Sequence, residues 1–421
     1  MSSTVSAEIE VASPPPGPPP APAVIAPRLD SIDLLRGIVL VVMSLDHLRD
    51  FLSGLPFAPE DMRHTWPALF FMRWVTHFCA PLFFFLAGTG AWLGRTRGRS
   101  TQQLSHYLWT RGLWLVFLEL TVVGFCWTFM FWSYAGVIWA LGWSMVLMAL
   151  LVRLPVKLVA GFGIVLILTH NLLDAVQPNA FGRMGWLWTL IHSPGFIPIA
   201  PQRGMWGVLY VLVPWVGVMA AGYAFGAIVQ MEAIRRRRLM YLIGGSATAL
   251  FLVIRATNLF GMPLVPQLAW GSLWKFEPQP TFAMTLVAFL NTQKYPPATQ
   301  YLLMTLGPGI LTLALFDRFN VARLALGRFL VAFGRGPMFY YLVHIAAAHA
   351  VAVLIAAALG QPWKWLFPGG FMLAPPPPGY GHGLAFIYSV WITLNVALYF
   401  PVRWYAEYKR THRHQWWLSY L

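Results

Sequence analysis

The stretch ALFFMRWVTHFCAPLFFFLAGTGAWL (68–93) decides the fold class of this chain. It is longer than the about 20 mostly apolar residues that cross the hydrocarbon core of a bilayer. Arg73 is its only Lys, Arg, Asp or Glu. The sequence therefore predicts an all-α, polytopic membrane bundle of about ten transmembrane helices. The other expected spans are 32–53, 106–128, 134–152, 156–175, 205–230, 239–257, 298–316, 337–359 and 383–403.

The composition supports a membrane protein. Of the 421 residues, 58% are hydrophobic and only 10% are charged, whereas a soluble domain carries about 25% charged residues. The chain has too little charge to cover a water-facing surface, so the lipid bilayer is its expected environment. The net charge of +15 comes largely from short basic loops. Such loops are typical of membrane orientation signals, and no nucleic-acid partner is expected.

The distribution of basic residues predicts the topology. Lys and Arg concentrate in alternate connecting segments, at 95–99, 153–157, 235–238, 318–335 and 403–413. The positive-inside rule makes these segments cytoplasmic, and an even number of spans then places both termini on the cytoplasmic side. The long loops on the opposite side are expected to cap a pocket. They are 54–67, 176–204, 258–297 and 360–382.

Three regions are expected along the chain. Residues 1–27 are rich in proline, and they predict a disordered cytoplasmic tail. Residues 28–405 form the transmembrane domain, and residues 406–421 form a basic and aromatic cytoplasmic tail. The apolar stretch 281–290 is too short to span a bilayer. It is expected to form a re-entrant or interfacial helix.

Polar residues at membrane depth mark candidate functional positions, because they are costly there unless they face a cavity or a partner. At 100° per residue, Arg36, His47 and Asp50 share one face of the first helix. Arg73 and His77 lie four residues apart and share a face of the second. If the two helices are antiparallel neighbours, His47 and His77 lie at similar depth, and we expect them to face a common cavity.

Further polar side chains lie in later spans, among them Glu119 and His344. A histidine oriented by a carboxylate can act as a general base. His47 or His77, together with Asp46, Asp50 or Glu119, has the composition for this chemistry. Pairing of Arg36 with Asp33 at a helix end is an equally good explanation of those two charges. The spacing of His and Cys residues supports neither a metal site nor a regular pair of haem ligands.

Two segments carry a family resemblance. RLDSIDLLRGIVLVVMSLDHLRDFL (28–52) and RWVTHFCAPLFFFLAGTGAWL (73–93) resemble the first two helices of bacterial membrane proteins of the heparan-α-glucosaminide N-acetyltransferase catalytic-domain family. Weaker similarity extends over most of the chain after residue 27. These further segments are 214–226, 294–297, 302–308, 333–344 and 416–421.

The resemblance implies a membrane-bound enzyme that moves an acyl group, most simply acetyl, from cytoplasmic acyl-CoA to a sugar or another amine or hydroxyl acceptor at the outer face. It also implies the cytoplasmic (inner) membrane of a bacterium, and a histidine acting as base or nucleophile. The catalytic candidates are His77, His47, Asp46 and His64, the last because it lies in the loop ahead of the second helix. The candidates for binding acyl-CoA or acceptor are Arg36, Asp50, Arg73, Glu119, Lys294 and His344.

Within the resemblance, Arg36 is the preferred contact for the CoA phosphates, since arginine is well suited to phosphate. No metal is expected. A transporter or exporter of a small or lipid-linked substrate is the main alternative, because polar residues in a bundle also suit a substrate path. A third hypothesis is that the protein is a non-catalytic membrane scaffold. The acceptor, the acyl chain and a possible homo-oligomeric state stay open at this level.

Overall fold

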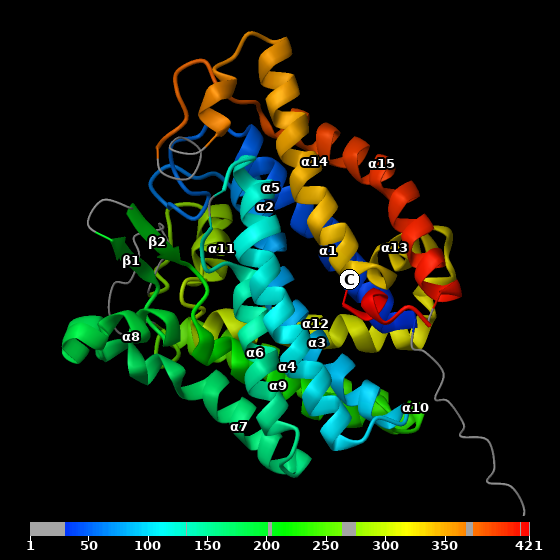
Figure 1. Ribbon diagram of the computed structural model, residues 1–421. Coiled ribbons are helices and arrows are strands. Elements are labelled where there is room, and N and C mark those ends of the chain that lie inside the picture. The colour runs from blue at the N-terminus through cyan, green and yellow to red at the C-terminus, as the bar shows by residue number, and fades with distance from the viewer. Residues whose placement is uncertain are drawn as a thin grey trace, which may run out of the picture.

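The chain folds into a helical bundle (Figure 1). The computed structural model describes residues 30–131, 133–200, 204–262, 275–367, 374–412 and 414–420. The predicted tail at 1–27 and Arg413 of the C-terminal basic cluster lie outside these residues. The helices up to the small sheet are α1 (Asp30–Leu52), α2 (Pro67–Thr76), α3 (Cys79–Thr96), α4 (Thr101–Leu118), the π-helix η1 (Glu119–Val123), α5 (Gly124–Thr128), α6 (Val137–Leu151), α7 (Val156–Thr169), η2 (His170–Ala175), η3 (Pro178–Met184) and α8 (Gly185–Ile191).

Helices dominate the second half as well. They are α9 (Leu212–Val229), α10 (Ala233–Thr257), α11 (Phe282–Leu290), α12 (Thr299–Phe319), η4 (Val321–Arg323), α13 (Ala325–Arg335), α14 (Pro337–Ala358), η5 (Trp363–Leu366), α15 (Leu384–Thr411) and η6 (Trp416–Ser419). Among the described residues, eight helical segments are long and apolar enough to cross a membrane. The other two predicted spans correspond to α1, which carries several charges, and to α6, which has only 15 residues. The predicted polytopic helical bundle is confirmed.

Several predicted boundaries are wrong in detail. The span 68–93 is interrupted by a turn at His77 and Phe78, between α2 and α3. The span predicted from residue 205 begins instead as a strand, and its helix starts at Leu212. The basic run 235–238 lies inside α10 and not in a loop. Glu232 is the N-cap of this helix, and its carboxylate accepts from the backbone N–H groups of Ile234 and Arg235.

Helix α1 occupies the centre of one half of the bundle. It packs against α2, α3, α12, α13, α14 and α15. The contact with α13 is very close: a Cβ added at Gly37 would lie 1.9 Å from the carbonyl oxygen of Leu330. Small residues allow membrane helices to approach to this distance. A glycine also allows close contact between α3 and α9, where a Cβ on Gly88 would lie 2.0 Å from the carbonyl oxygen of Met219.

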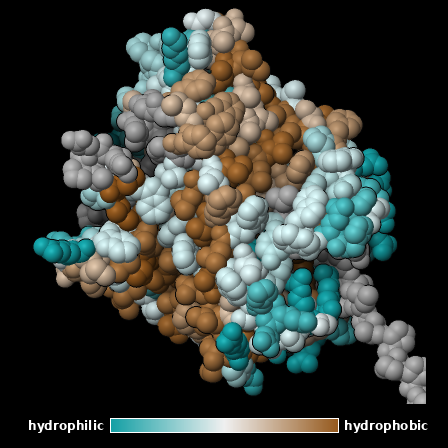
Figure 2. Space-filling model, in the orientation of Figure 1, coloured by the Kyte–Doolittle hydropathy of each residue, from teal (hydrophilic) through white to brown (hydrophobic). Residues whose placement is uncertain are grey.

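The outward faces of the bundle are apolar, as a lipid-facing surface requires. Figure 2 shows hydrophobic residues running in a band across the molecule, with hydrophilic residues gathered near its margins. Large apolar side chains are exposed on α4, α7 and α15. Examples are Phe117, Leu158, Ile164, Val165, Ile392 and Phe400.

Irregular segments and a small sheet gather at one end of the bundle. Strand β1 (Gly195–Ala200) pairs antiparallel with β2 (Gly204–Val208), a hairpin that the all-α prediction did not include. The loop after α1 and the loop between α14 and α15 lie side by side at the top of Figure 1. The hydroxyl of Tyr380 donates to the carbonyl of Phe51, and the His382 N–H donates to the carbonyl of Leu52 at 2.8 Å. These contacts hold the end of α1 in place.

The α1–α13 contact yields a stability prediction. Gly37→Ala should lower the free energy of unfolding by about 1–3 kcal/mol, because the added methyl group meets backbone that cannot rotate away. The measurement is thermal unfolding of the purified protein in detergent. Gly90→Ala on α3 is the matched control: no atom lies within 4 Å of its added Cβ, so no loss is expected. Equal melting temperatures of Gly37→Ala and wild type would contradict the contact.

Candidate active site

A cavity of about 640 Å³ opens at the end of the bundle where the loops gather. Its walls come from the C-terminal part of α1, from α2 and α3, and from the loops at 53–63, 209–210, 293–295 and 374–376. Three of the four long loops contribute lining residues, and none of the described residues of 176–204 does. The charged residues that line it are Asp46, Arg49, Asp50, Glu60, Asp61, Arg63, Arg73 and Lys294.

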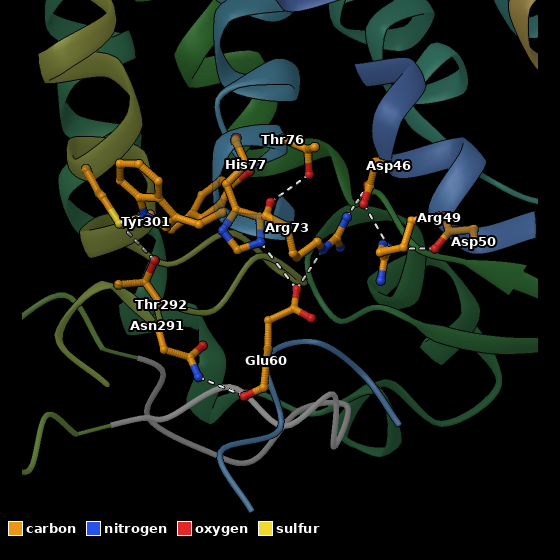
Figure 3. A network of polar contacts seen from close by, with 12 residues as sticks. Asp46, Arg49, Asp50, Glu60, Arg73, Thr76, His77, Asn291, Thr292 and Tyr301 are labelled. Atoms are coloured by element: carbon orange, nitrogen blue, oxygen red, sulfur yellow. Dashed lines mark hydrogen bonds and ion pairs between the residues drawn. The ribbon is translucent and has the colours of Figure 1, made fainter. Parts of the chain in front are cut away.

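Arg73 of α2 is the centre of an ion-pair network in the cavity wall (Figure 3). Its Nη1 donates to Asp46 of α1, and its Nε donates to Oε1 of Glu60 at 2.8 Å. Arg49 continues the network, donating from Nη2 to Asp46 at 2.8 Å and to Asp50 at 2.5 Å. The Arg73 side chain is only 9% exposed. One buried guanidinium therefore joins two helices and the loop between them.

A segment that is distant in sequence holds the loop that carries Glu60. The side-chain amide of Asn291 donates to the backbone carbonyl of Glu60 at 2.8 Å. Burial by itself would raise the pKa of the Glu60 carboxyl. The Arg73 guanidinium and the hydrogen bond to His77 outweigh burial and hold the pKa of Glu60 well below its usual range. Glu60 is therefore an ionised partner for Arg73 at neutral pH.

His47 of α1 lines the cavity and pairs with His344 of α14. Nδ1 of His47 lies 2.8 Å from Nε2 of His344, and Nδ1 of His344 lies 2.9 Å from the backbone carbonyl of Tyr340. A carbonyl only accepts, so the His344 proton must be on Nδ1. His344 Nε2 then accepts from His47 Nδ1, and the lone pair of the His47 imidazole is on Nε2. This arrangement gives a neutral His47 the tautomer of a general base.

Neighbouring rings hold the histidine pair in position. Trp127 meets the His47 ring edge-on with centroids 4.8 Å apart, and Tyr340 stacks on His344 at 4.8 Å. The Tyr340 hydroxyl donates to Oδ1 of Asn395 at 2.6 Å, and the Asn395 amide donates to Ser44 of α1 at 3.0 Å. Side chains from α1, α14 and α15 thereby hold both imidazoles in a single orientation.

His77 does not face the cavity, so the prediction that it shares one with His47 is wrong. Its side chain is fully buried in the turn between α2 and α3. Nε2 lies 3.3 Å from Oε1 of Glu60, and the Tyr301 hydroxyl donates to the His77 backbone carbonyl at 2.7 Å. The helix predicted over 68–93 tightens to a turn at His77 and Phe78, where the His77 N–H donates to the Trp74 carbonyl at 3.0 Å.

The remaining predicted residues are scattered. His64 is half exposed on the outer loop, with Nδ1 2.8 Å from Asp61 Oδ2, and is not among the cavity-lining residues. Glu119 lies in η1 and accepts from the Ile138 N–H at 3.1 Å, at the start of α6. Arg36 donates to Asp33 at 3.1 Å, far from the cavity. The structure therefore contains the pairing of Arg36 with Asp33 that the sequence analysis gave as an alternative explanation of these charges.

Lys294 lines the cavity, and its role in binding stays a prediction. Arg255, which sequence reasoning did not identify, holds the backbone that precedes it. Arg255 of α10 is completely buried and donates to the backbone carbonyls of Ala288, Phe289 and Asn291 at 2.8, 2.9 and 2.7 Å. These carbonyls end α11, where a cation is favourable. The position of Arg255 near the end of an apolar span was the feature of the sequence that could have marked it as a candidate.

A second hollow of about 630 Å³ lies between the end of α3, the start of α4 and the α6–α7 connection. Trp92, Arg95 and Arg153 are among its lining residues. The sequence predicts this end of the bundle to be cytoplasmic. Arg36, the predicted contact for the CoA phosphates, is not among its lining residues.

Comparison with known proteins gives one family. The family described as heparan-alpha-glucosaminide N-acetyltransferase, catalytic, matches residues 28–260, which is more than half of the chain. The matched region contains Arg73 and its two partners, Asp46 and Glu60, together with His47 and His77. No curated protein matches the chain.

The ion-pair network yields a second prediction. Arg73→Met leaves the buried carboxylates of Asp46 and Glu60 without their main partner, a change that typically costs about 3–5 kcal/mol. We expect a large drop in the melting temperature in detergent. Arg63→Met is the matched control, because Arg63 also pairs with a carboxylate but its side chain is 82% exposed. A surface pair contributes little, so wild-type stability is expected there. Wild-type stability of Arg73→Met would refute the central role of Arg73.

Proposed function

The chain belongs to the heparan-α-glucosaminide N-acetyltransferase catalytic family, and from this premise we propose that it transfers an acyl group, most simply acetyl, from acyl-CoA to an amine or hydroxyl acceptor in the outer cavity. Multiple apolar helices make it a multi-pass membrane protein. The proposed general base is His47. The cavity that His47 lines is the proposed place of reaction.

The hydrogen bond between His47 and His344 is the observation that carries this proposal. It leaves Nε2 of His47 as the acceptor of a proton. In the proposed reaction, the acceptor nitrogen or oxygen attacks the thioester carbonyl carbon while its proton passes to His47. The C–S bond then breaks, and the CoA sulfur leaves with that proton. His344 is a positioning residue, which keeps the His47 tautomer suitable for the proton transfer.

The cavity walls support a sugar-like acceptor. Eight Phe, Tyr and Trp side chains line it, from α3, α5, α14, η5 and the connecting loops: Phe57, Phe83, Trp127, Tyr134, Tyr210, Tyr295, Tyr341 and Trp365. Aromatic faces offer large apolar contact area, and the tyrosines add hydroxyl groups. A few placed polar groups among apolar walls are typical of small-molecule sites. Asp50, a predicted binding residue, lies in the cavity wall, where it accepts from Arg49 at 2.5 Å.

The proposed sidedness combines the topology of the sequence with the two hollows. Acceptor would enter the cavity from the non-cytoplasmic side, and acyl-CoA would approach from the cytoplasmic side. Both chain ends would be cytoplasmic, in a bacterial inner membrane. The hollow at Arg95 and Arg153 offers two guanidinium groups and the Trp92 ring for the nucleotide end of CoA. This leaves Arg36 to its structural pair with Asp33.

The proposed base gives a direct test. Purified protein in detergent is incubated with labelled acetyl-CoA and a panel of amino sugars and polyols. His47→Ala should reduce transfer by about 10²–10⁴-fold, as expected for loss of a general base. His77→Gln should retain most activity, since an amide can keep the contact with Glu60, and His64→Ala should resemble wild type.

Other outcomes decide between the alternatives. Wild-type transfer by His47→Ala would rule out His47 as the base, and a selective loss in His64→Ala or His77→Gln would move the role to that histidine. Protein that is folded but neither binds nor turns over acetyl-CoA, while it moves a substrate across vesicle membranes, would support the transporter reading.

The positioning role of His344 has a separate test. His344→Gln retains an oxygen that can accept from His47 Nδ1, whereas His344→Phe keeps the ring and loses the acceptor. We expect kcat to fall strongly in His344→Phe and to recover substantially in His344→Gln, with little change in KM for either substrate. Equal losses in both variants would indicate a packing role only.

A further inference from the structure

The outer cavity contains a buried cation that the proposed proton transfer does not use. Lys294 follows α11 and is only 7% exposed, and its side chain lines the cavity. Its Nζ lies 5.1 Å from the centroid of the Tyr295 ring. No carboxylate of the residues that the structure describes comes within ion-pair distance of it. Asp46 and Asp50 act on this ammonium group only from beyond ion-pair distance, and a largely buried lysine without a direct acceptor is costly.

The other charges of the cavity are already engaged. Asp46 and Glu60 share Arg73, and Asp50 pairs with Arg49. On the loop, Asp61 pairs with Arg63 at 3.1 Å. Each carboxylate that lines the cavity therefore has an arginine in contact, while the lysine does not. Lys294 balances the charge of this network at longer range, but its ammonium group has no direct acceptor among the described residues of the cavity wall, and an anionic ligand would supply one.

The backbone that carries Lys294 is held firmly, so its position is not accidental. Arg255 fixes the carbonyl of Asn291, and the Asn291 amide fixes the carbonyl of Glu60. Asn291 and Lys294 both belong to the buried connection between α11 and α12. The same short segment thus supports the Arg73 network and presents the ammonium group to the cavity.

We propose that Lys294 binds an anionic group of the acceptor, a carboxylate or a phosphate, and so makes the enzyme selective for acidic amino sugars over neutral ones. This inference rests on the proposed function in calling the ligand an acceptor. A lysine supplies a compact positive charge with three donors, which suits either anion. The aromatic walls would contact the sugar ring while Lys294 holds its acidic substituent.

Binding measurements test the inference without depending on turnover. Calorimetric titration of the detergent-purified full chain compares glucosamine, glucosamine 6-phosphate and 2-amino-2-deoxyglucuronic acid. At least one acidic sugar should bind about 10-fold or more tightly than glucosamine. A hydrogen bond to a charged group contributes about 1.5–3 kcal/mol, and about 1.4 kcal/mol corresponds to a tenfold change in affinity. The two acidic probes distinguish a phosphate site from a carboxylate site.

Matched variants assign the effect to this residue. Lys294→Gln should remove the preference for the acidic sugar and leave glucosamine binding unchanged, and Lys294→Arg should restore part of it. Lys364→Gln is the control, because Lys364 also lies over an aromatic ring, 5.9 Å from the centroid of Trp363, but outside the cavity and exposed; it should match wild type.

Three results would overturn the proposal. Equal affinity of wild type for neutral and acidic sugars would do so, as would failure of both acidic sugars to bind. A Lys294→Gln variant that loses kcat equally for all acceptors with unchanged binding would assign Lys294 to the oxyanion of the reaction instead. The acetyl-CoA assay is read separately, so acidic sugar binding without transfer would fault the proposed function and leave the anion site standing.

Discussion

The contact of Arg73 with Asp46 and Glu60 is the constraint on which the cavity end of this protein depends. Three elements carry these residues: α1, α2 and the loop that joins them. None of the three charges is tolerable at its depth without the others. Once the guanidinium is in place, Arg49 and Asp50 complete the pairing along α1. The cavity wall is therefore electrostatically satisfied before any ligand arrives.

This satisfied wall leaves two groups with capacity for a ligand. One is the outward nitrogen of His47, whose partner His344 is itself anchored to backbone. The other is the ammonium group of Lys294. A site built from one free base and one free cation on a rigid scaffold can be selective, because its remaining polar groups are preorganised and do not reorient when a ligand binds.

Sequence patterns could predict the bundle because long apolar stretches have few structural alternatives in a membrane. They also indicated that polar faces of the first two spans meet, but the contact there joins Asp46 to Arg73 and not His47 to His77. They could not predict the partner of His47, because His344 is 297 residues away in sequence. Nor could periodicity reveal the turn at His77 or the contact of that ring with Glu60. Glu60 and Asn291 lie in loops, where no helical pattern applies.

The charges of α1 have a consequence for how the chain enters the membrane. Asp46, Arg49 and Asp50 lie in its C-terminal half, and Asp33 and Arg36 lie near its beginning. Each such charge opposes partition of an isolated helix into lipid, by about 2.5–3.5 kcal/mol near the helix centre. Arg73 reaches Asp46 only after α2 has been synthesised. The first helix is therefore expected to wait beside the insertion machinery until the second emerges, so that the two leave it together as a hairpin.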